Sequence, residues 1–250
     1  MSMLLRQTGL VFLRSIRPTL HRPSVIIIGL AQPLLYLVLF GPLLRGLSTG
    51  DGDSWQWYVP GIMVQLALFG TAYSGFGLLP ELRSGALERL RVSPVSRIAL
   101  LLGRVSRDVT LLVVQAALLA LVSVPFGFRA GVGPVLLGLA LLALLGLAIG
   151  SASYALAMRL RQEYAFAPVL AMTVLPAMLL SGVLLPMNLA PRWLYVLSRV
   201  NPLSHVVDAE RAIVAGQWGA TSIWLGPLLA VALAAVCVTW GAWTFRQDSV

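Results

Sequence analysis

The sequence predicts an all-α membrane protein with six transmembrane helices, and two observations support this fold class. Of the 250 residues, 58% are hydrophobic and only 11% are charged, which leaves too little polar surface for a soluble globule of ordinary composition. The apolar residues also gather in runs long enough to cross a hydrocarbon core of about 30 Å. The chain is therefore predicted to form a single membrane domain over residues 1–250.

The chain begins with an amphipathic segment. Within residues 1–24, one arc of a helical wheel carries apolar residues and another carries arginines. The apolar arc consists of Leu4, Leu5, Val11, Phe12 and Ile16, and the basic arc contains Arg6, Arg14 and Arg17. This pattern is typical of an interfacial helix that lies in the plane of one leaflet.

Six apolar runs follow, and each is predicted to span the membrane. They cover residues 25–44, 59–80, 108–128, 134–158, 165–185 and 223–245. Pro168 and Pro176 predict that the fifth span is bent or broken, because proline removes a helical hydrogen bond. Trp55, Trp57 and Tyr58 precede the second span and are typical of an interfacial aromatic belt.

Small residues mark the second span and the end of the fifth. Small side chains allow another helix to approach closely. Residues of this kind, with a proline that disturbs the helix, are predicted to form packing surfaces along a central translocation path: Gly70, Ser74, Gly75, Gly77, Pro176, Ser181 and Gly182.

The segment between the fifth and sixth spans is too apolar for a free loop and too interrupted for a span. Its apolar residues fall in two groups on either side of Asn201-Pro202. We therefore expect two short re-entrant helices that dip into the outer leaflet before the sixth span.

The arginines set the expected orientation. Alternate connecting segments hold thirteen arginines on one side and five on the other, and the richer side is expected to be the cytoplasm. Both termini are then cytoplasmic. The net charge of +9 could suggest a nucleic-acid partner, but the arginines lie mainly at the ends of apolar runs, where the membrane orientation accounts for them. Nucleic acid is therefore not predicted as a partner. All eighteen basic residues are arginine, which favours a GC-rich, bacterial genome and hence a bacterial plasma membrane.

The segment from Glu81 to Arg107 is the longest charged interruption of the sequence and contains six arginines. Leu82, Ala86, Leu87 and Leu90 recur in it at helical spacing, and Ser93-Pro94 ends the pattern. A second helix can start near residues 94–96 and run towards the membrane. The segment is either a solvated connector or a pair of short helices. We favour the helices, whose apolar faces would be covered by lipid headgroups or by a partner protein.

Catalytic and metal-binding patterns are not found. The chain has two histidines, one cysteine (Cys237) and no H-E-x-x-H motif. A Ser181–His205 pair would lack an orienting third group. Because there is no lysine, the phosphate-binding motif G-x-x-x-x-G-K-[ST] cannot occur, and any ATP would be hydrolysed by another polypeptide. The acidic residues fall at or beyond the predicted span ends, which does not favour a proton-coupled transporter.

The chain resembles the ABC-2 type permeases, the membrane subunits of a group of bacterial ABC exporters, and within them the daunorubicin-resistance-like drug exporter permeases. The resemblance rests on the order of the segments and on two patterns. The first inner loop carries Glu81, Gly85, Glu88, Ser93, Pro94 and Ser96 in the spacing E-x-x-x-G-x-x-E-x-x-x-x-S-P-x-S, and SGVLLPMNLAPRWLYVLSRVNPLSHVVDAERAI precedes the sixth span.

The resemblance implies a coupling helix seated in a separate ATPase subunit. The residues it assigns to this contact are Glu81, Arg83, Gly85, Glu88, Arg89, Arg91 and Pro94. It also implies two ATPase copies that bind ATP and Mg²⁺, a second permease chain in a homodimer or heterodimer, and export of an amphipathic drug, antibiotic or lipid-like molecule. This chain itself is expected to bind no cofactor.

A second function stays open at this stage. The chain would then be a membrane-embedded anchor or enzyme that docks a cytosolic partner through residues 81–107. The transported substrate also stays open, because one membrane architecture serves many substrates.

Overall fold

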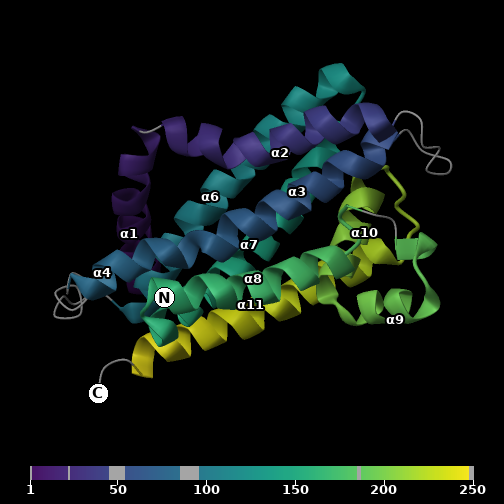
Figure 1. Ribbon diagram of the computed structural model, residues 1–250. Coiled ribbons are helices and arrows are strands. Elements are labelled where there is room, and N and C mark those ends of the chain that lie inside the picture. Colours follow the sequence, from purple (N-terminus) through teal and green to yellow (C-terminus); the bar gives the residue numbers. More distant parts are fainter. Residues whose placement is uncertain (1, 22, 45–53, 85–95, 185–186, 248–250) are drawn as a thin grey trace.

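The computed structural model describes residues 2–21, 23–44, 54–84, 96–184 and 187–247. These residues are almost entirely helical, and no strand occurs among them (Figure 1). The elements are α1 (Ser2–Leu20), α2 (Pro23–Leu44), α3 (Ser54–Ala72), η1 (Tyr73–Leu78), α4 (Leu79–Arg83), α6 (Arg97–Ser123), η2 (Val124–Phe126), α7 (Val132–Leu160), α8 (Glu163–Leu180), η3 (Met187–Leu189), α9 (Arg192–Val200), α10 (Pro202–Val214) and α11 (Ser222–Gln247). The predicted all-α class is confirmed.

The described part of the chain has five or six helices that are long and apolar enough to cross a membrane. Five segments meet this condition by themselves: Ser54–Arg83, Arg97–Phe126, Val132–Leu160, Glu163–Leu180 and Ser222–Phe245. Helix α2 makes a sixth if it is counted together with α1, from which it is bent by 78°. The protein is thus a multi-pass membrane protein. Where the bilayer lies along each helix stays a prediction.

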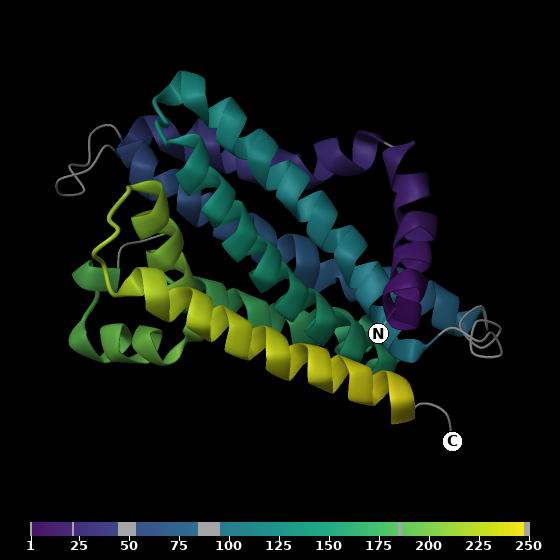
Figure 2. The ribbon, with the colours of Figure 1, turned by 180° about the vertical axis from the view of Figure 1, so that it is seen from behind.

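The long helices run roughly along one axis and alternate in direction, whereas α1 crosses that axis (Figures 1 and 2). As a result, the start of α1 and the end of α11 lie at the same end of the molecule, which we call the terminal end. Helix α1 packs there on α6, where Gly103 leaves room for Val11: a Cβ at Gly103 would lie 2.6 Å from the Val11 Cβ. Helices α9 and α10 lie at the opposite end.

The second span is one long segment in which a 3₁₀ turn interrupts the α-helix. Between α3 and α4, η1 forms where the Ser153 hydroxyl of α7 inserts between backbone groups that would otherwise hydrogen-bond within the helix. Ser153 Oγ accepts a hydrogen bond from the Gly75 N–H (2.9 Å) and donates one to the Ala72 carbonyl (2.5 Å). A side chain that enters the ladder in this way is a recognised cause of a local change in helix geometry.

Helix α6 begins at Arg97, close to the start near residues 94–96 that is predicted for the second helix of the loop, and it continues through the predicted 108–128 span, so Asp108 lies within a helix. Two expectations need correction. Helix α8 is not broken at either proline, because in apolar surroundings a break would expose more backbone groups than each proline removes. Trp55 and Tyr58 are buried in the core rather than placed in an outward-facing belt.

The two short helices expected around Asn201-Pro202 are present as α9 and α10. Asn201 forms their junction: its side-chain oxygen accepts a hydrogen bond from the Leu203 N–H at 3.1 Å and so caps α10. Its amide Nδ2 donates to the Ala177 carbonyl of α8 at 2.6 Å. This junction fixes the pair of helices to the end of α8.

Candidate functional site

A cavity of about 670 Å³ lies between α2, the α3–η1 segment and α6. Its volume is within the range of small-molecule sites, about 300 to 1,000 Å³. The lining residues come from the first half of α2, from the later part of the α3–η1 segment and from the middle of α6: Val25, Ile28, Gly29, Gln32 and Pro33 of α2; Gln65, Leu66, Phe69, Gly70, Tyr73, Ser74 and Gly77 of α3 and η1; and Arg107, Asp108, Leu111, Leu112 and Gln115 of α6. We call this space the α2–α6 cavity.

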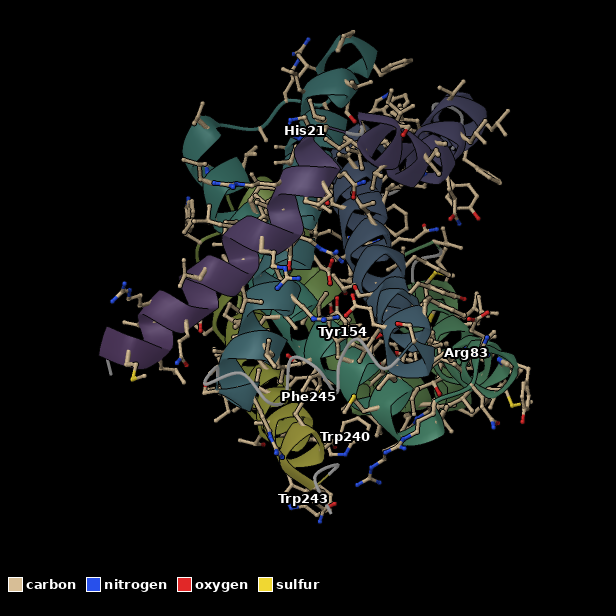
Figure 3. The ribbon with its side chains drawn as sticks, turned by 90° about the vertical axis from the view of Figure 1, so that its left-hand side faces the viewer. His21, Arg83, Tyr154, Trp240, Trp243 and Phe245 are labelled. Atoms are coloured by element: carbon tan, nitrogen blue, oxygen red, sulfur yellow. The ribbon has the colours of Figure 1, made fainter. Side chains whose placement is uncertain are left out.

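One wall of the α2–α6 cavity carries a buried charged group. Arg107 Nε donates a hydrogen bond to Asp108 Oδ1 at 2.8 Å, and Tyr154 Oη of α7 donates to Asp108 Oδ2 at 2.7 Å. Asp108 is only 8% exposed. Figure 3, which views the terminal end, shows Tyr154 in the middle of the helix bundle. Both carboxylate oxygens therefore have partners, and the negative charge is compensated within the protein.

The small residues of the second span divide between two surfaces. A Cβ at Gly70 or Gly77 would meet no atom within 4 Å, and both residues line the cavity together with Ser74. Gly75 faces the other way, where a Cβ would lie 2.6 Å from the Phe166 ring and 2.7 Å from the Ser153 carbonyl oxygen. Gly75 is thus a close-packing position.

Pro176, Ser181 and Gly182 lie away from the α2–α6 cavity. Pro176 is exposed on α8, and the Ser181 hydroxyl donates to the Met178 carbonyl at 2.6 Å. Gly182 has a φ of 78°, which favours glycine. His205 Nε2 lies 3.0 Å from the Arg199 carbonyl oxygen. Ser181 and His205 thus have separate backbone partners.

Arg211 of α10 ties the end opposite the terminal end together. Its guanidinium donates to the carbonyls of Trp57 (3.1 Å), Gly182 (2.8 Å) and Val183 (3.2 Å). It also lies over the Trp57 ring, with 3.8 Å between Cζ and the ring centroid, a cation–π contact. Burial lowers the pKa of Arg211 to about 10, so it stays charged at neutral pH. Helix α10 is thereby fixed to α3 and to the end of α8.

Glu210 of α10 is fully buried, with 0% of its surface exposed. Neither carboxylate oxygen has a hydrogen-bond partner among the described residues, and a Cβ at Gly138 of α7 would lie 2.3 Å from Oε1. Burial raises the pKa of Glu210 to about 8. A carboxyl group in such surroundings is held in its neutral form near pH 7.

At the terminal end, ionic contacts hold the helices that flank residues 85–95. Arg104 Nη2 of α6 donates to Glu81 Oε2 of α4 at 2.5 Å. Arg83 Nη1 of α4 lies 3.4 Å from Glu163 Oε1 of α8. Glu81 and Arg83 belong to the predicted coupling set. The other members of that set lie outside the described residues: Gly85, Glu88, Arg89, Arg91 and Pro94.

Sequence reasoning missed Gln65, Tyr154 and the buried states of Asp108 and Glu210. One signal was available for Asp108: apolar residues at Leu100, Leu101 and Val105 continue the helical pattern toward the loop. No sequence signal places Tyr154 beside Asp108, because that contact depends on which helices are neighbours.

Comparisons with known proteins agree on a family. A family model described as "ABC-2 type transporter" matches residues 6–215. A daunorubicin resistance ABC transporter permease protein, DrrB1 of Streptomyces coeruleorubidus, is 26% identical over 86% of this chain and 77% of its own length. A putative transport permease, ycf38 of Cyanophora paradoxa, is 30% identical over 76% of this chain and 68% of its own length.

A third relative is a probable doxorubicin resistance ABC transporter permease protein, DrrC of Mycobacterium tuberculosis. It is 27% identical over 78% of this chain and 72% of its own length. These likenesses cover most of the chain, as does the family match over residues 6–215. The chain therefore belongs to the ABC-2 type transporter family.

Proposed function

We propose that this chain is the transmembrane permease subunit of an ATP-binding cassette exporter that moves an amphipathic drug, antibiotic or lipid-like molecule out of the cell. The observation that carries the proposal is the family match over residues 6–215, with two relatives named as drug resistance permeases. The absence of lysine from the sequence assigns ATP hydrolysis to a separate subunit.

Co-purification tests this function. A tagged form of this chain is expressed together with an ABC ATPase encoded beside its gene. The ATPase is expected to co-purify with the tagged chain. The reconstituted complex should hydrolyse ATP faster when a transported molecule is added. If no ATPase binds, or if export continues when the ATPase cannot hydrolyse ATP, the proposed function is wrong.

The proposed complex contains two ATPase subunits, which bind ATP and Mg²⁺, and two permease chains, either identical or different. Support for an ATPase contact at the terminal end comes from α4 and α6, which lie on either side of residues 85–95 and are joined by the Glu81–Arg104 ion pair. Arg104 is only 11% exposed, so this pair is better shielded from water than a surface salt bridge. Helix α4 lies between η1 and residues 85–95 in the sequence, so a displacement of these residues would be passed through α4 to η1.

Glu88→Arg is expected to abolish most export while the protein still inserts into the membrane. If Glu88 contacts the ATPase, the reversed charge meets an unfavourable partner and costs on the order of 2 kcal/mol or more at a desolvated contact. ATPase co-purification and export should both fall. Gly85→Pro, which would break a helix there, should act in the same direction. Gln247→Arg adds an arginine outside the loop and serves as the control. If both loop variants export as well as this control, the loop only connects two spans and does not contact the ATPase.

We also propose that the protein lies in a bacterial plasma membrane with both termini in the cytoplasm. The alternating directions of the long helices support this arrangement (Figure 1), as do the thirteen arginines on one side against five on the other. Arg159 of α7, one of these thirteen, lies over Trp240 and Trp243 of α11, at 5.7 and 5.4 Å from the ring centroids. Figure 3 shows these two tryptophans near the edge of the terminal end.

Single cysteines test this orientation. In a Cys237→Ser background, cysteines at positions 48 and 217 should react with an impermeant thiol reagent in intact cells, and cysteines at positions 2 and 249 should not. Labelling at position 2 or 249 would contradict the proposed topology.

A further inference from the structure

We propose that the α2–α6 cavity is a binding site for an amphipathic aromatic molecule that carries uncharged hydrogen-bond donors such as hydroxyl or N–H groups. The inference rests on the proposed function in one respect, namely that the bound molecule is the exported one. It adds the place of binding and the chemical groups that the site recognises.

The walls favour an apolar, partly aromatic body. Phe69 and Tyr73 lie on the cavity wall with stacked rings, 6.1 Å between centroids. Ile28 and Leu111 supply aliphatic surface on α2 and α6. Gly70 contributes no side chain, so a flat molecule can approach the backbone of α3 closely. Such a cavity, mostly apolar with a few polar groups, is the usual form of a small-molecule site.

Two unpaired oxygens indicate which polar groups the molecule carries. Gln65 lines the cavity, is only 2% exposed, and its Oε1 has no hydrogen-bond partner among the described residues. Ser74, on the same segment, has a buried Oγ in the same condition. Leaving a buried acceptor unpaired costs about 1 to 3 kcal/mol, which a donor on a ligand would recover. The cavity therefore offers the polar side-chain amide of Gln65 as well as the space left by its small residues.

The charged groups of the cavity argue against recognition through a full charge. Both oxygens of Asp108 already accept hydrogen bonds, from Arg107 and from Tyr154. The Arg107 guanidinium is in turn held by Asp108. A ligand cation would find no free carboxylate here, and a ligand anion would have to compete with Asp108 for Arg107. Uncharged donors aimed at Gln65 and Ser74 are therefore the better match.

The rim of the cavity is open on the surface of this chain. Ile28 is 72% exposed and Tyr73 is 37% exposed, while Gly70 and Gly77 leave space around their backbone. These residues lie in the halves of α2 and α3 nearer the terminal end, which the proposed topology assigns to the cytoplasmic leaflet. An amphipathic molecule dissolved in that leaflet could enter sideways between the helices.

Binding of doxorubicinone, the uncharged aglycone of doxorubicin, to the full chain in nanodiscs of phosphatidylcholine and phosphatidylglycerol tests the site. Doxorubicinone is fluorescent and combines a planar aromatic system with hydroxyl donors, and it lacks the protonated amino sugar of doxorubicin. Gly70→Leu, whose Cβ would meet no atom within 4 Å and whose side chain would occupy the cavity, is expected to weaken binding at least about tenfold, a change of 1.4 kcal/mol. Gln65→Leu, which removes the amide at similar volume, is expected to weaken binding about three- to tenfold. Gly133→Leu is the matched control: its Cβ also meets open space, but it lies outside the cavity.

The thermal stability of the same proteins separates a binding role from a structural one. Gln65→Leu should melt at the wild-type temperature or above it, because it removes an unpaired buried oxygen. If wild type does not bind doxorubicinone, or if all four proteins bind it equally, the proposal is overturned. Native mass spectrometry that finds a phospholipid held by wild type and lost in Gly70→Leu, with doxorubicinone binding unchanged, would assign the cavity to lipid instead.

The two proposals fail separately. Doxorubicinone bound in the cavity of a protein that shows no ATP-dependent transport would contradict the exporter and leave the site standing. ATP-dependent export of doxorubicinone by wild type, with binding unchanged in Gly70→Leu and Gln65→Leu, would contradict the site and leave the exporter standing.

Discussion

Gly75→Leu is expected to prevent the protein from folding, whereas Gly77→Leu should leave it folded. A Cβ at Gly75 would lie 2.7 Å from the Ser153 carbonyl oxygen and 2.6 Å from the Phe166 ring. A real Cβ cannot approach a backbone oxygen that closely, so α7 would have to move away from η1. A leucine would add three further carbons to that clash, in a place where even one extra methylene typically costs about 1 to 3 kcal/mol.

The displacement would also remove the contact that shapes η1. The Ser153 hydroxyl bonds both the Gly75 N–H and the Ala72 carbonyl, and both bonds need the two backbones in contact. Expression of each variant as a fluorescent fusion, followed by size-exclusion chromatography in detergent, measures the outcome. Gly77→Leu is the matched control because a Cβ there meets no atom within 4 Å. Equal yields and melting temperatures of the two variants would contradict the packing described for Gly75.

The fold was predictable because the bilayer allows little choice. A run of about 20 apolar residues satisfies its backbone hydrogen bonds in lipid only as a helix. Helices α7 (Val132–Leu160) and α11 (Ser222–Gln247) therefore match the predicted runs 134–158 and 223–245 within a few residues. The start of α6 was also predictable within a few residues, from Ser93-Pro94, whereas the pairing of Arg104 and Arg107 with Glu81 and Asp108 inside the protein was not.

The candidate site was only partly predictable. Residue size pointed to the second span, and Gly70, Ser74 and Gly77 do line the α2–α6 cavity. Size alone could not separate these residues from Gly75, because the 3₁₀ turn of η1 decides which way Ser74, Gly75 and Gly77 face. Gln65 lies in an apolar run and looks like any tolerated polar residue. Its significance appears only when α2 and α6 are seen to enclose it.

Glu210→Gln is expected to stabilise the protein at pH 8 and to change its stability little at pH 4. Glu210 is fully buried, and burial raises its pKa from 4.5 to about 8. In the unfolded chain the carboxyl group ionises above pH 4.5, whereas in the folded protein it stays protonated until about pH 8. Folding therefore takes up a proton between these values, and the Glu210 contribution to stability falls as the pH rises through that window.

The expected size follows from the same shift. Each pKa unit corresponds to about 1.36 kcal/mol, so the wild-type penalty at pH 8 is on the order of a few kcal/mol. Glutamine keeps the shape of the side chain and has no charge to bury at any pH. Melting temperatures of wild type and Glu210→Gln in detergent, measured from pH 4 to pH 8, should diverge steadily as the pH increases.

Asp208→Asn provides the control for this series. Asp208 is on the same helix, but it is about one-third exposed and forms an ion pair with Arg199, with 2.6 Å between Nη1 and Oδ2. Because this ion pair lies near the surface, its removal should not stabilise the protein at pH 8. Parallel melting curves for wild type and Glu210→Gln across this range would mean that Glu210 is ionised and paired in the folded protein. Its contact with Gly138 would then have to open to admit a cation or water beside α7.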